Sequence, residues 1–301
     1  MRVQPSPEVA TALEQGRPVV ALESTIISHG LPRPDNLAAA QEFEEILRSQ
    51  GVTPATVAVL GGELKAGLTA DELSRIANED VPKLTVRDLP VVLGMGGSGA
   101  TTVAATSWIA DRAGIRVFAT GGLGGVHRGA SETFDESADL TVLGQVPITV
   151  VSAGVKSILD IPATLERLET LGVIVLGFRT KDFPSFWLTS SGHQLDWRAE
   201  DAFAVASVMH SRDQLGLRSG IVVANPLPEE KQLDPQVHDE ALERALAEAE
   251  AKGLSGKEVT PFLLQRIVEL TGGDSLAVNL DIARNNIEVA ARIATAAAEY
   301  P

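Results

Sequence analysis

The sequence predicts an α/β fold with three layers, α/β/α, a mostly parallel mixed sheet and a helical C-terminal section. Up to Asn225, short apolar runs rich in Val and Ile alternate with amphipathic or alanine-rich stretches, and only helix-period stretches follow. Such alternation is typical of a parallel sheet with helices on both faces. The 301 residues contain no Pro/Ser-rich linker, charge block or internal repeat. We therefore expect a single domain over residues 1–301, with a boundary near Asn225 as the alternative.

Each expected strand is an apolar run bounded by glycine or polar residues, as buried strands are. The expected strands are Val19–Leu22, Thr56–Leu60, Leu89–Leu93, Arg116–Thr120, Ile148–Ser152, Val173–Phe178 and Gly220–Ala224. The helices expected between them are Leu37–Ser49, Ala70–Ala77, Ala100–Ala113, Pro162–Leu171 and Asp201–His210. The C-terminal helices are expected over Pro235–Lys252, Pro261–Leu270 and Ser275–Glu299.

Composition and charge exclude several classes of protein. Lys and Arg total 25 against 40 for Asp and Glu, and the net charge of −15 repels nucleic-acid backbones and anionic membranes. The absence of cysteine excludes disulfides, zinc–thiolate sites, iron–sulfur clusters and cysteine nucleophiles. The start, MRVQPSPEVA, lacks the apolar core of a signal peptide, and no apolar run has membrane-spanning length. We expect a cytoplasmic protein with no nucleic-acid or membrane partner.

The stretch Gly94–Gly99 matches the G-x-G-x-x-G pattern of dinucleotide-binding proteins, after an apolar run and before the helix expected from Ala100. That pattern also requires an acid at the end of the next strand, which here ends Thr-Gly-Gly. A nicotinamide cofactor is therefore disfavoured. Backbone N–H groups at the start of the helix, with Thr101 and Thr102, suit a phosphate, and a plain turn fits as well.

A second glycine-rich stretch, Thr120–Gly129, follows an expected strand and contains five glycines together with His127 and Arg128. Glycine lets a backbone approach a ligand closely, and the two side chains add donors suited to a phosphate or carboxylate. Open α/β sheets bind ligands at the carboxyl ends of their strands. We therefore expect a ligand here rather than an ordinary solvated loop.

Two carboxylates and one lysine stand out next. Asp135 and Asp139 are four residues apart, so on one helical turn they would share a face and attract a cation such as Mg²⁺ or Mn²⁺. The alternative is a pair of solvated acids. Lys156 follows the strand Ile148–Ser152 among small and apolar neighbours, where burial would lower its pKa and leave a nucleophilic amine. Glu23 follows the first strand and is a candidate general acid or a helix cap.

Taken together, these segments resemble the pseudouridine-5′-phosphate glycosidase family, the indigoidine synthase A-like group. The resemblance covers nearly the whole chain. It is carried by the strings ALESTIISHGLPRPDN, TPATVAVLGGELKAGLT, SGATTVAAT, FATGGLGGVHRGA, TFDESADL, SAGVKSILD, GIVVANPLPE and TPFLLQRIVELTGGDSLAVN.

The resemblance implies reversible conversion of pseudouridine 5′-phosphate and water to uracil and ribose 5-phosphate by a lyase of the pseudouridylate synthase type. It implies one Mn²⁺ per subunit, a homotrimer and a role in pseudouridine catabolism. By position, the family's proton donor falls on Glu23, its Schiff-base lysine on Lys156 and its metal ligand on Asp135. The implied substrate contacts are Lys83, Val103, Ser137, Ala138, Asp139 and Asn279, to which the glycine-rich loop adds His127.

A carbon–carbon glycosidic bond has no heteroatom leaving group, so the usual pair of carboxylates does not suffice. If the ribose ring opens and Lys156 forms an iminium at C1′, protonation of uracil C5 lets the base leave in a reverse Mannich-type step. Two alternatives remain at this point. Another Schiff-base phosphosugar lyase would use the same lysine, and a non-catalytic phosphosugar-binding protein would not need it.

Overall fold

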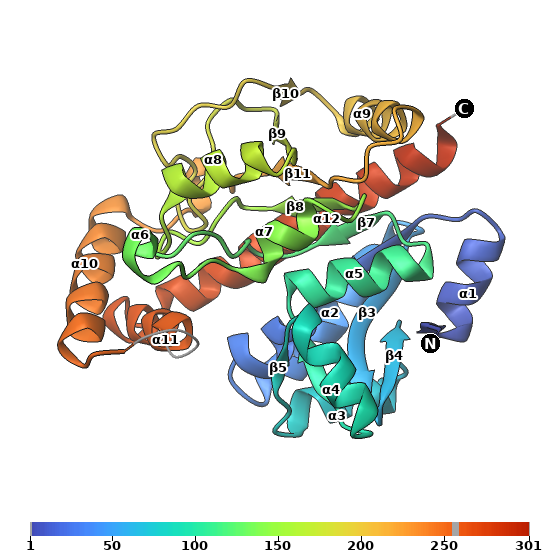
Figure 1. The fold of residues 1–301 in the computed structure, drawn as a ribbon, viewed down its shortest axis with the longest axis horizontal. Helices are drawn as coiled ribbons and strands as arrows, with labels where there is room; N and C mark the ends of the chain where they lie inside the picture. The colour runs from blue at the N-terminus through green and yellow to red at the C-terminus, as the bar shows by residue number, and fades with distance from the viewer. Residues whose placement is uncertain (1, 255–258, 301) are drawn as a thin grey trace.

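A computed structural model of the chain, which describes residues 2–254 and 259–300, shows an eleven-stranded mixed sheet between two helical layers (Figure 1). The order of strands along the sheet is β1-β4-β3-β2-β7-β8-β11-β9-β10, and β6 pairs with both β3 and β5. The strands are β1 (Gln4–Pro5), β2 (Val19–Leu22), β3 (Thr53–Leu60), β4 (Glu63–Ala66), β5 (Lys83–Leu84), β6 (Gly99–Thr101), β7 (Val117–Ala119), β8 (Thr149–Ser152), β9 (Ile174–Phe178), β10 (Arg198–Ala199) and β11 (Ile221–Ala224).

The centre of the sheet is parallel. Strand β2 pairs in parallel with β3 and β7, β8 pairs with β7 and β11, and β9 pairs with β11 and β10. Antiparallel pairing occurs where β4 and β6 join β3. Strands β2, β3, β7, β8 and β11 are buried along their whole length, and β9 is buried except at its start. Burial on both faces explains their continuous Val- and Ile-rich runs.

Helices cover both faces of the sheet (Figure 1). Apolar side chains of α2, α9 and α12 pack on one face in a cluster that includes Phe43, Val205 and Ile287. Apolar side chains of α1, α5, α7 and α8 pack on the other. The helices are α1 (Pro7–Glu14), α2 (Asp35–Ser49), α3 (Ala70–Asn78), α4 (Leu89–Gly94), α5 (Val103–Ala113), α6 (Ala130–Thr133), α7 (Ala138–Leu143), α8 (Ile161–Thr170), α9 (Ala202–Gln214), α10 (Pro235–Ala251), α11 (Val259–Leu270) and α12 (Asp274–Glu299), with short helices η1 (Ile26–Gly30), η2 (Val86–Asp88) and η3 (Glu229–Lys231).

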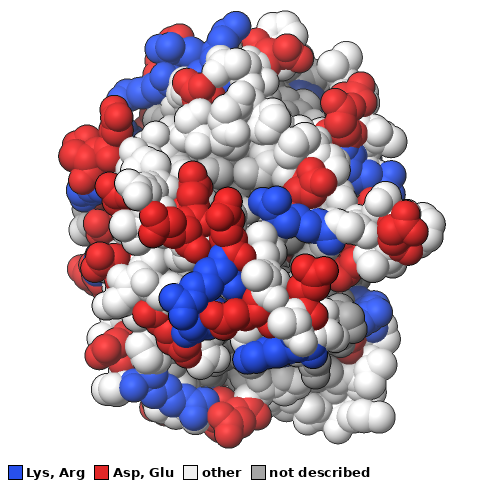
Figure 2. All heavy atoms as spheres, turned by 90° about the vertical axis from the view of Figure 1, so that its left-hand side faces the viewer, with Lys and Arg blue, Asp and Glu red and all other residues white. Residues whose placement is uncertain are grey.

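The C-terminal section is helical, as expected, and α10 and α11 lie together at one end of the molecule (Figure 1). Their buried residues, Ala245 and Ile267 among them, belong to the same apolar cluster as the sheet. On the outer face Arg266 pairs with Glu248 and Glu269. Figure 2 shows acidic and basic side chains interspersed over this face.

The three-layer architecture confirms the fold class, and six of the seven predicted strands are present. The prediction for Leu89–Leu93 is wrong, because these residues form α4. A run of five apolar residues fits a strand or a buried helix equally well. Pro90 lies in its first turn, where a proline favours a helix start, and the preceding Thr85 and Asp88 form a reciprocal capping box.

The glycine-rich stretch Gly94–Gly99 is a turn and not a dinucleotide loop. It follows a helix, and the expected helix from Ala100 instead begins at Val103, after β6. The amide of Gly62 donates to the carbonyl of Gly97 at 2.7 Å, so the stretch lies against the β3–β4 turn. Within the ranges 2–254 and 259–300, no helix is long and apolar enough to cross a membrane.

Candidate active site

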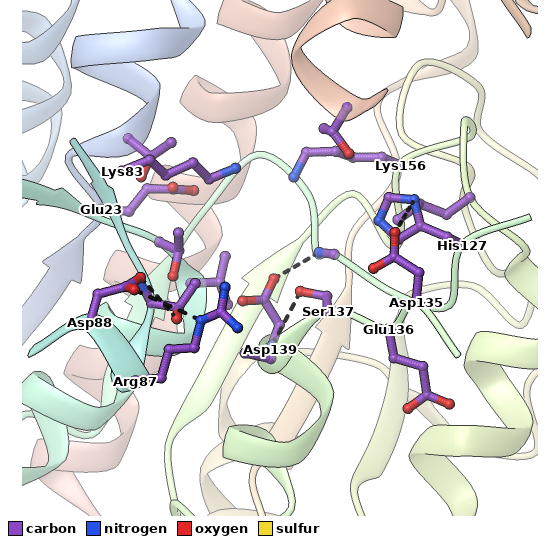
Figure 3. A pocket seen from close by; sticks show the side chains of 18 residues that line it. Glu23, Lys83, Arg87, Asp88, His127, Asp135, Glu136, Ser137, Asp139 and Lys156 are labelled. Atoms are coloured by element: carbon purple, nitrogen blue, oxygen red, sulfur yellow. Dashed lines mark hydrogen bonds and ion pairs between the residues drawn. The ribbon is translucent and has the colours of Figure 1, made fainter. Parts of the chain in front are cut away.

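The carboxyl ends of β2, β7 and β8 lie side by side in the sheet and bring together three segments that are distant in sequence. Glu23 follows β2, Thr120 follows β7, and Lys156 follows β8 by four residues. Glu23 and Lys156 border a cavity of about 390 Å³ whose wall also includes residues of β5, η2, α5 and α7 (Figure 3). The predicted site residues in its wall are Glu23, Lys83, Val103, His127, Asp135, Ser137, Ala138, Asp139 and Lys156.

Glu23 lies at the wall of the cavity and is held by Thr120, whose hydroxyl donates to its carboxylate. Burial raises the pKa of Glu23, because desolvation disfavours the charged form. The positive charges of Lys156 and Lys83 and the Thr120 hydrogen bond oppose this shift, and the charge of Asp139 adds to it. A carboxyl group whose pKa is raised in this way is suited to act as a proton donor.

Lys156 lies after β8, which is separated from β2 and Glu23 by the single strand β7. Its Nζ donates to the carbonyl of Gly122 at 3.1 Å. Burial lowers the pKa of Lys156, and the nearby charge of Lys83 lowers it further, while Glu23 and Asp139 act in the opposite direction. Figure 3 shows the amino groups of Lys83 and Lys156 pointing toward one another across the cavity. The site thus favours a neutral, nucleophilic amine.

Asp139 is buried at the start of α7, and both of its oxygens accept backbone hydrogen bonds. The amide of Ala104 in α5 donates to Oδ1 and that of Gly124 to Oδ2, each at 2.9 Å. Ser137 caps the same helix by accepting from the amide of Asp139. The carboxylate therefore ties the glycine-rich loop to the N-termini of α5 and α7. A side chain at Gly124 would collide with Ser137 and Asp139, which explains the glycine there.

The expectation that Asp135 and Asp139 share one helical face is wrong, because Asp135 precedes α7, which begins at Ala138. Asp135 instead faces His127 in the cavity wall, with 3.9 Å between its Oδ2 and the histidine Nδ1 (Figure 3). The amide of His127 also donates to the carbonyl of Asp135 at 3.0 Å. The two acids therefore do not form a paired cation site.

Asp135 fits a metal held by few protein ligands. In the described ranges, no three His, Cys, Asp or Glu side chains converge into a group that could hold an ion. A hard divalent cation needs no such group, because Mg²⁺ usually binds through one or two carboxylates, water and substrate phosphates. The carboxylate of Asp135 is about one-third exposed (35%) and lines the cavity. It could bind an ion in that mode.

Two of the residues singled out from the sequence lie elsewhere. Asn279 of α12 is not in the wall of this cavity, and its Oδ1 accepts from the indole N–H of Trp187 at 2.6 Å. Arg128 is turned away from the cavity and donates to the carbonyls of Ser157 at 3.2 Å and Ile158 at 3.3 Å. It therefore supports the turn after Lys156 and does not serve as a ligand donor.

The structure also adds wall residues that the sequence analysis did not identify. The sequence pattern that could have identified some of them is T-x-x-D at Thr85–Asp88, which predicts a helix start. The resulting short helix η2 carries Arg87 to the cavity, where it joins Lys83 as a cationic group in an acidic protein. The added wall residues are Thr25, Thr85, Arg87, Asp88, Glu136, Leu159 and Thr260, and the wall also contains Thr102 and Gly124 from the two segments already singled out as candidate ligand sites.

Comparison with known proteins gives a consistent picture. The family model described as indigoidine synthase A like protein matches residues 8–296. A pseudouridine-5′-phosphate glycosidase of Frankia alni is 59% identical over 97% of this chain and 81% of its own length. One of Salinispora tropica is 58% identical over 97% of this chain and 90% of its own length.

Two solved structures share the fold. The prealnumycin C-glycosynthase AlnA, solved in complex with ribulose 5-phosphate, superposes with a TM-score of 0.92 at 36% identity, over 99% of this chain and 97% of its own. An indigoidine synthase A-like protein of Thermotoga maritima superposes with a TM-score of 0.89 at 39% identity, over 98% of this chain and 96% of its own.

Proposed function

The chain belongs to the indigoidine synthase A-like family, and from that membership we propose that it is a pseudouridine-5′-phosphate glycosidase. It cleaves the carbon–carbon glycosidic bond of pseudouridine 5′-phosphate reversibly, to uracil and ribose 5-phosphate. The observation that carries the proposal is the pair formed by Lys156 and Glu23, which line one cavity. Burial lowers the pKa of Lys156 and raises the pKa of Glu23, so it favours the neutral form of both side chains. The complex of a structural relative with ribulose 5-phosphate supports a phosphosugar as ligand.

Lys156 is the nucleophile in this proposal. As the C1′–O4′ bond opens, O4′ takes a proton and the neutral amine bonds to C1′. The nitrogen lone pair then forms a C=N bond to C1′ while the C1′–C5 bond breaks and uracil C5 takes a proton from water. Water hydrolyses the resulting imine, which releases ribose 5-phosphate and the free lysine.

Glu23 moves the protons of ring opening. Its raised pKa favours the protonated carboxyl, which can donate to O4′ and afterwards accept the proton that the lysine nitrogen loses. Thr120 fixes the orientation of this carboxyl group through its hydrogen bond. The two proton transfers leave Glu23 in its starting state.

The 5′-phosphate binds at the cationic side of the cavity. Lys83 and Arg87 supply charge, and α5 presents its N-terminus at Val103, where helix N–H groups favour anions. Ser137 and Ala138 at the start of α7 complete the wall. This local concentration of donors offsets the repulsion that a net charge of −15 exerts on a phosphate.

One Mn²⁺ per subunit completes the proposal, held by Asp135 together with water. When bound, such an ion stabilises negative charge that develops on the departing base. The proposed enzyme is a cytoplasmic homotrimer. Sedimentation velocity gives the oligomeric state directly.

The test is the release of uracil from pseudouridine 5′-phosphate, followed by chromatography, with and without added Mn²⁺ after chelation. We expect turnover that depends on the ion. Binding of the substrate without any release of uracil would instead identify a non-catalytic phosphosugar-binding protein. Cleavage of other phosphosugars but not of this one would identify a different Schiff-base lyase.

A further inference from the structure

A second cluster of chemically active side chains lies behind the cavity wall, next to the lysine. Ser157 follows Lys156 and is 4% exposed, and His238 of α10 is 3% exposed. The His238 Nε2 lies 2.8 Å from the Ser157 hydroxyl, and its Nδ1 lies 2.9 Å from Oδ1 of Asp239. This serine–histidine–aspartate chain joins the turn after β8 to a helix more than 80 residues away in sequence.

The arrangement resembles a hydrolytic triad, but the surroundings argue against a nucleophilic serine. Neither Ser157 nor His238 is in the wall of the cavity, so a substrate in the cavity does not reach the hydroxyl. The Asp239 carboxylate accepts from Nδ1–H, which leaves Nε2 as an acceptor for the Ser157 hydroxyl. The cluster therefore serves to hold Ser157 in place.

From this we propose that His238 is a positioning residue for Lys156, which it holds in place through Ser157. The turn is fixed from two sides, by His238 on the Ser157 hydroxyl and by Arg128 on the Ser157 carbonyl. The Lys156 amide also donates to the carbonyl of Leu123 at 3.2 Å. From this fixed turn the lysine side chain reaches the Gly122 carbonyl, to which its Nζ donates at 3.1 Å.

The same histidine connects the lysine turn to α12. Its ring lies 6.0 Å from that of Trp187, centroid to centroid, and the Trp187 indole N–H donates to Asn279. Helices α10 and α12 thus reach the site through buried contacts. The inference rests on the proposed function in one respect, because it takes Lys156 to be the nucleophile.

The consequence is a testable link between α10 and the protonation of Lys156. The charged groups that influence this amine are Lys83, which lowers its pKa, and Glu23 and Asp139, which raise it, all against the larger effect of burial. A loosened turn lets the amine reach water, so its pKa returns toward the ordinary value. A purely structural role for His238 would leave that protonation unchanged in the folded protein.

We would compare Ser157→Ala and His238→Leu, which remove the bond, with His238→Gln, whose amide retains an acceptor near the Nε2 position. Asp234→Ala is the matched control, because it removes the N-cap of α10 but not the histidine contact. Lys156 is methylated with formaldehyde and cyanoborohydride over a range of pH, and the modified peptide is quantified by mass spectrometry. This readout does not depend on catalysis.

In Ser157→Ala and His238→Leu we expect the pH midpoint of Lys156 methylation to rise. We also expect kcat for uracil release to fall about tenfold or more with KM nearly unchanged, because a misplacement of a reacting group by about 1 Å can lower the rate about a hundredfold. His238→Gln and the control should retain the wild-type midpoint. A folded Ser157→Ala protein with wild-type midpoint and kcat overturns the proposal, as does a fluorophosphonate adduct on Ser157. If the wild type releases no uracil, the proposed function fails, and the methylation midpoint still decides the positioning.

Discussion

The hydrogen bond from Thr120 to Glu23 offers a direct test of how the protein controls its proposed acid. Thr120→Val replaces the hydroxyl by a methyl group of similar shape, so the change removes one donor and little else. The lost bond stabilises the ionised carboxylate, and its removal should raise the pKa of Glu23 further. Thr120→Ser restores the donor and serves as the control.

The size of the effect follows from the energy of such a bond. A hydrogen bond to a charged group contributes about 1.5–3 kcal/mol in general. The Glu23 side chain faces the cavity, where water and the neighbouring lysines compensate part of the loss, so the lower end of that range applies. About 1.4 kcal/mol is a factor of ten in the ratio of protonated to ionised carboxyl, which corresponds to about one pH unit.

The assay is the pH dependence of kcat/KM for uracil release, which reports the groups of the free enzyme. The limb that follows Glu23 should move to higher pH by about one unit in Thr120→Val and remain in place in Thr120→Ser. A limb that does not move in the valine variant would show that this bond does not control the protonation of Glu23. A limb that moves to lower pH would refute the sign of the argument.

Four further predictions concern the cavity. Lys156→Ala and Lys156→Arg should both reduce uracil release to background, because neither side chain forms an imine, and borohydride reduction with ribose 5-phosphate should label wild-type Lys156 and not another lysine. Asp135→Asn should lower activity sharply at low Mn²⁺ and recover partly at high Mn²⁺, with an unchanged melting temperature; full activity in a chelator would refute the assignment. Unphosphorylated pseudouridine should be cleaved orders of magnitude less efficiently than the 5′-phosphate, whereas efficiencies within about tenfold would contradict phosphate recognition. Glu23→Gln should raise the melting temperature above neutral pH. Because the folded-state pKa of Glu23 is raised, the stability that the protonated carboxyl contributes is full below the unfolded-state pKa and is lost as pH rises through the folded-state pKa. The difference in melting temperature between the variant and the wild type should therefore vanish at acid pH.

The parts of the fold that sequence reasoning predicts well are those with a strong periodic signal. The buried strand Val19–Leu22 has the predicted limits, and the long helices after Asn225 lie within a few residues of their predicted limits. The prediction of a strand at Leu89–Leu93 was wrong because so short an apolar segment has no periodicity that distinguishes a strand from a helix. The two-residue strands β1, β5 and β10 were missed for a related reason, since pairing with a neighbour and not composition defines them.

The candidate site was predictable to the extent that it follows from topology. Glu23 and Lys156 come after apolar runs, and parallel strands bring their carboxyl ends to one edge, so their proximity follows from the fold class. The partners that control them do not follow in this way. That Thr120 donates to Glu23, or that His238 holds Ser157, depends on contacts across 97 and 81 residues that no local pattern encodes.

The charges around the cavity couple the protonation states of Lys156 and Glu23. Burial disfavours the charge on both Glu23 and Lys156, while their mutual attraction favours both charges. Lys83 breaks this symmetry, because it lowers the pKa of both groups and so favours a neutral amine beside a carboxylate, whereas Asp139 raises both and favours the opposite pair. A substrate phosphate near Lys83 would cancel its charge and raise the pKa of both groups. Binding of the phosphate therefore couples to protonation of both groups: it favours the acid form in which Glu23 can donate a proton to the ribose oxygen, and it opposes the neutral form of Lys156.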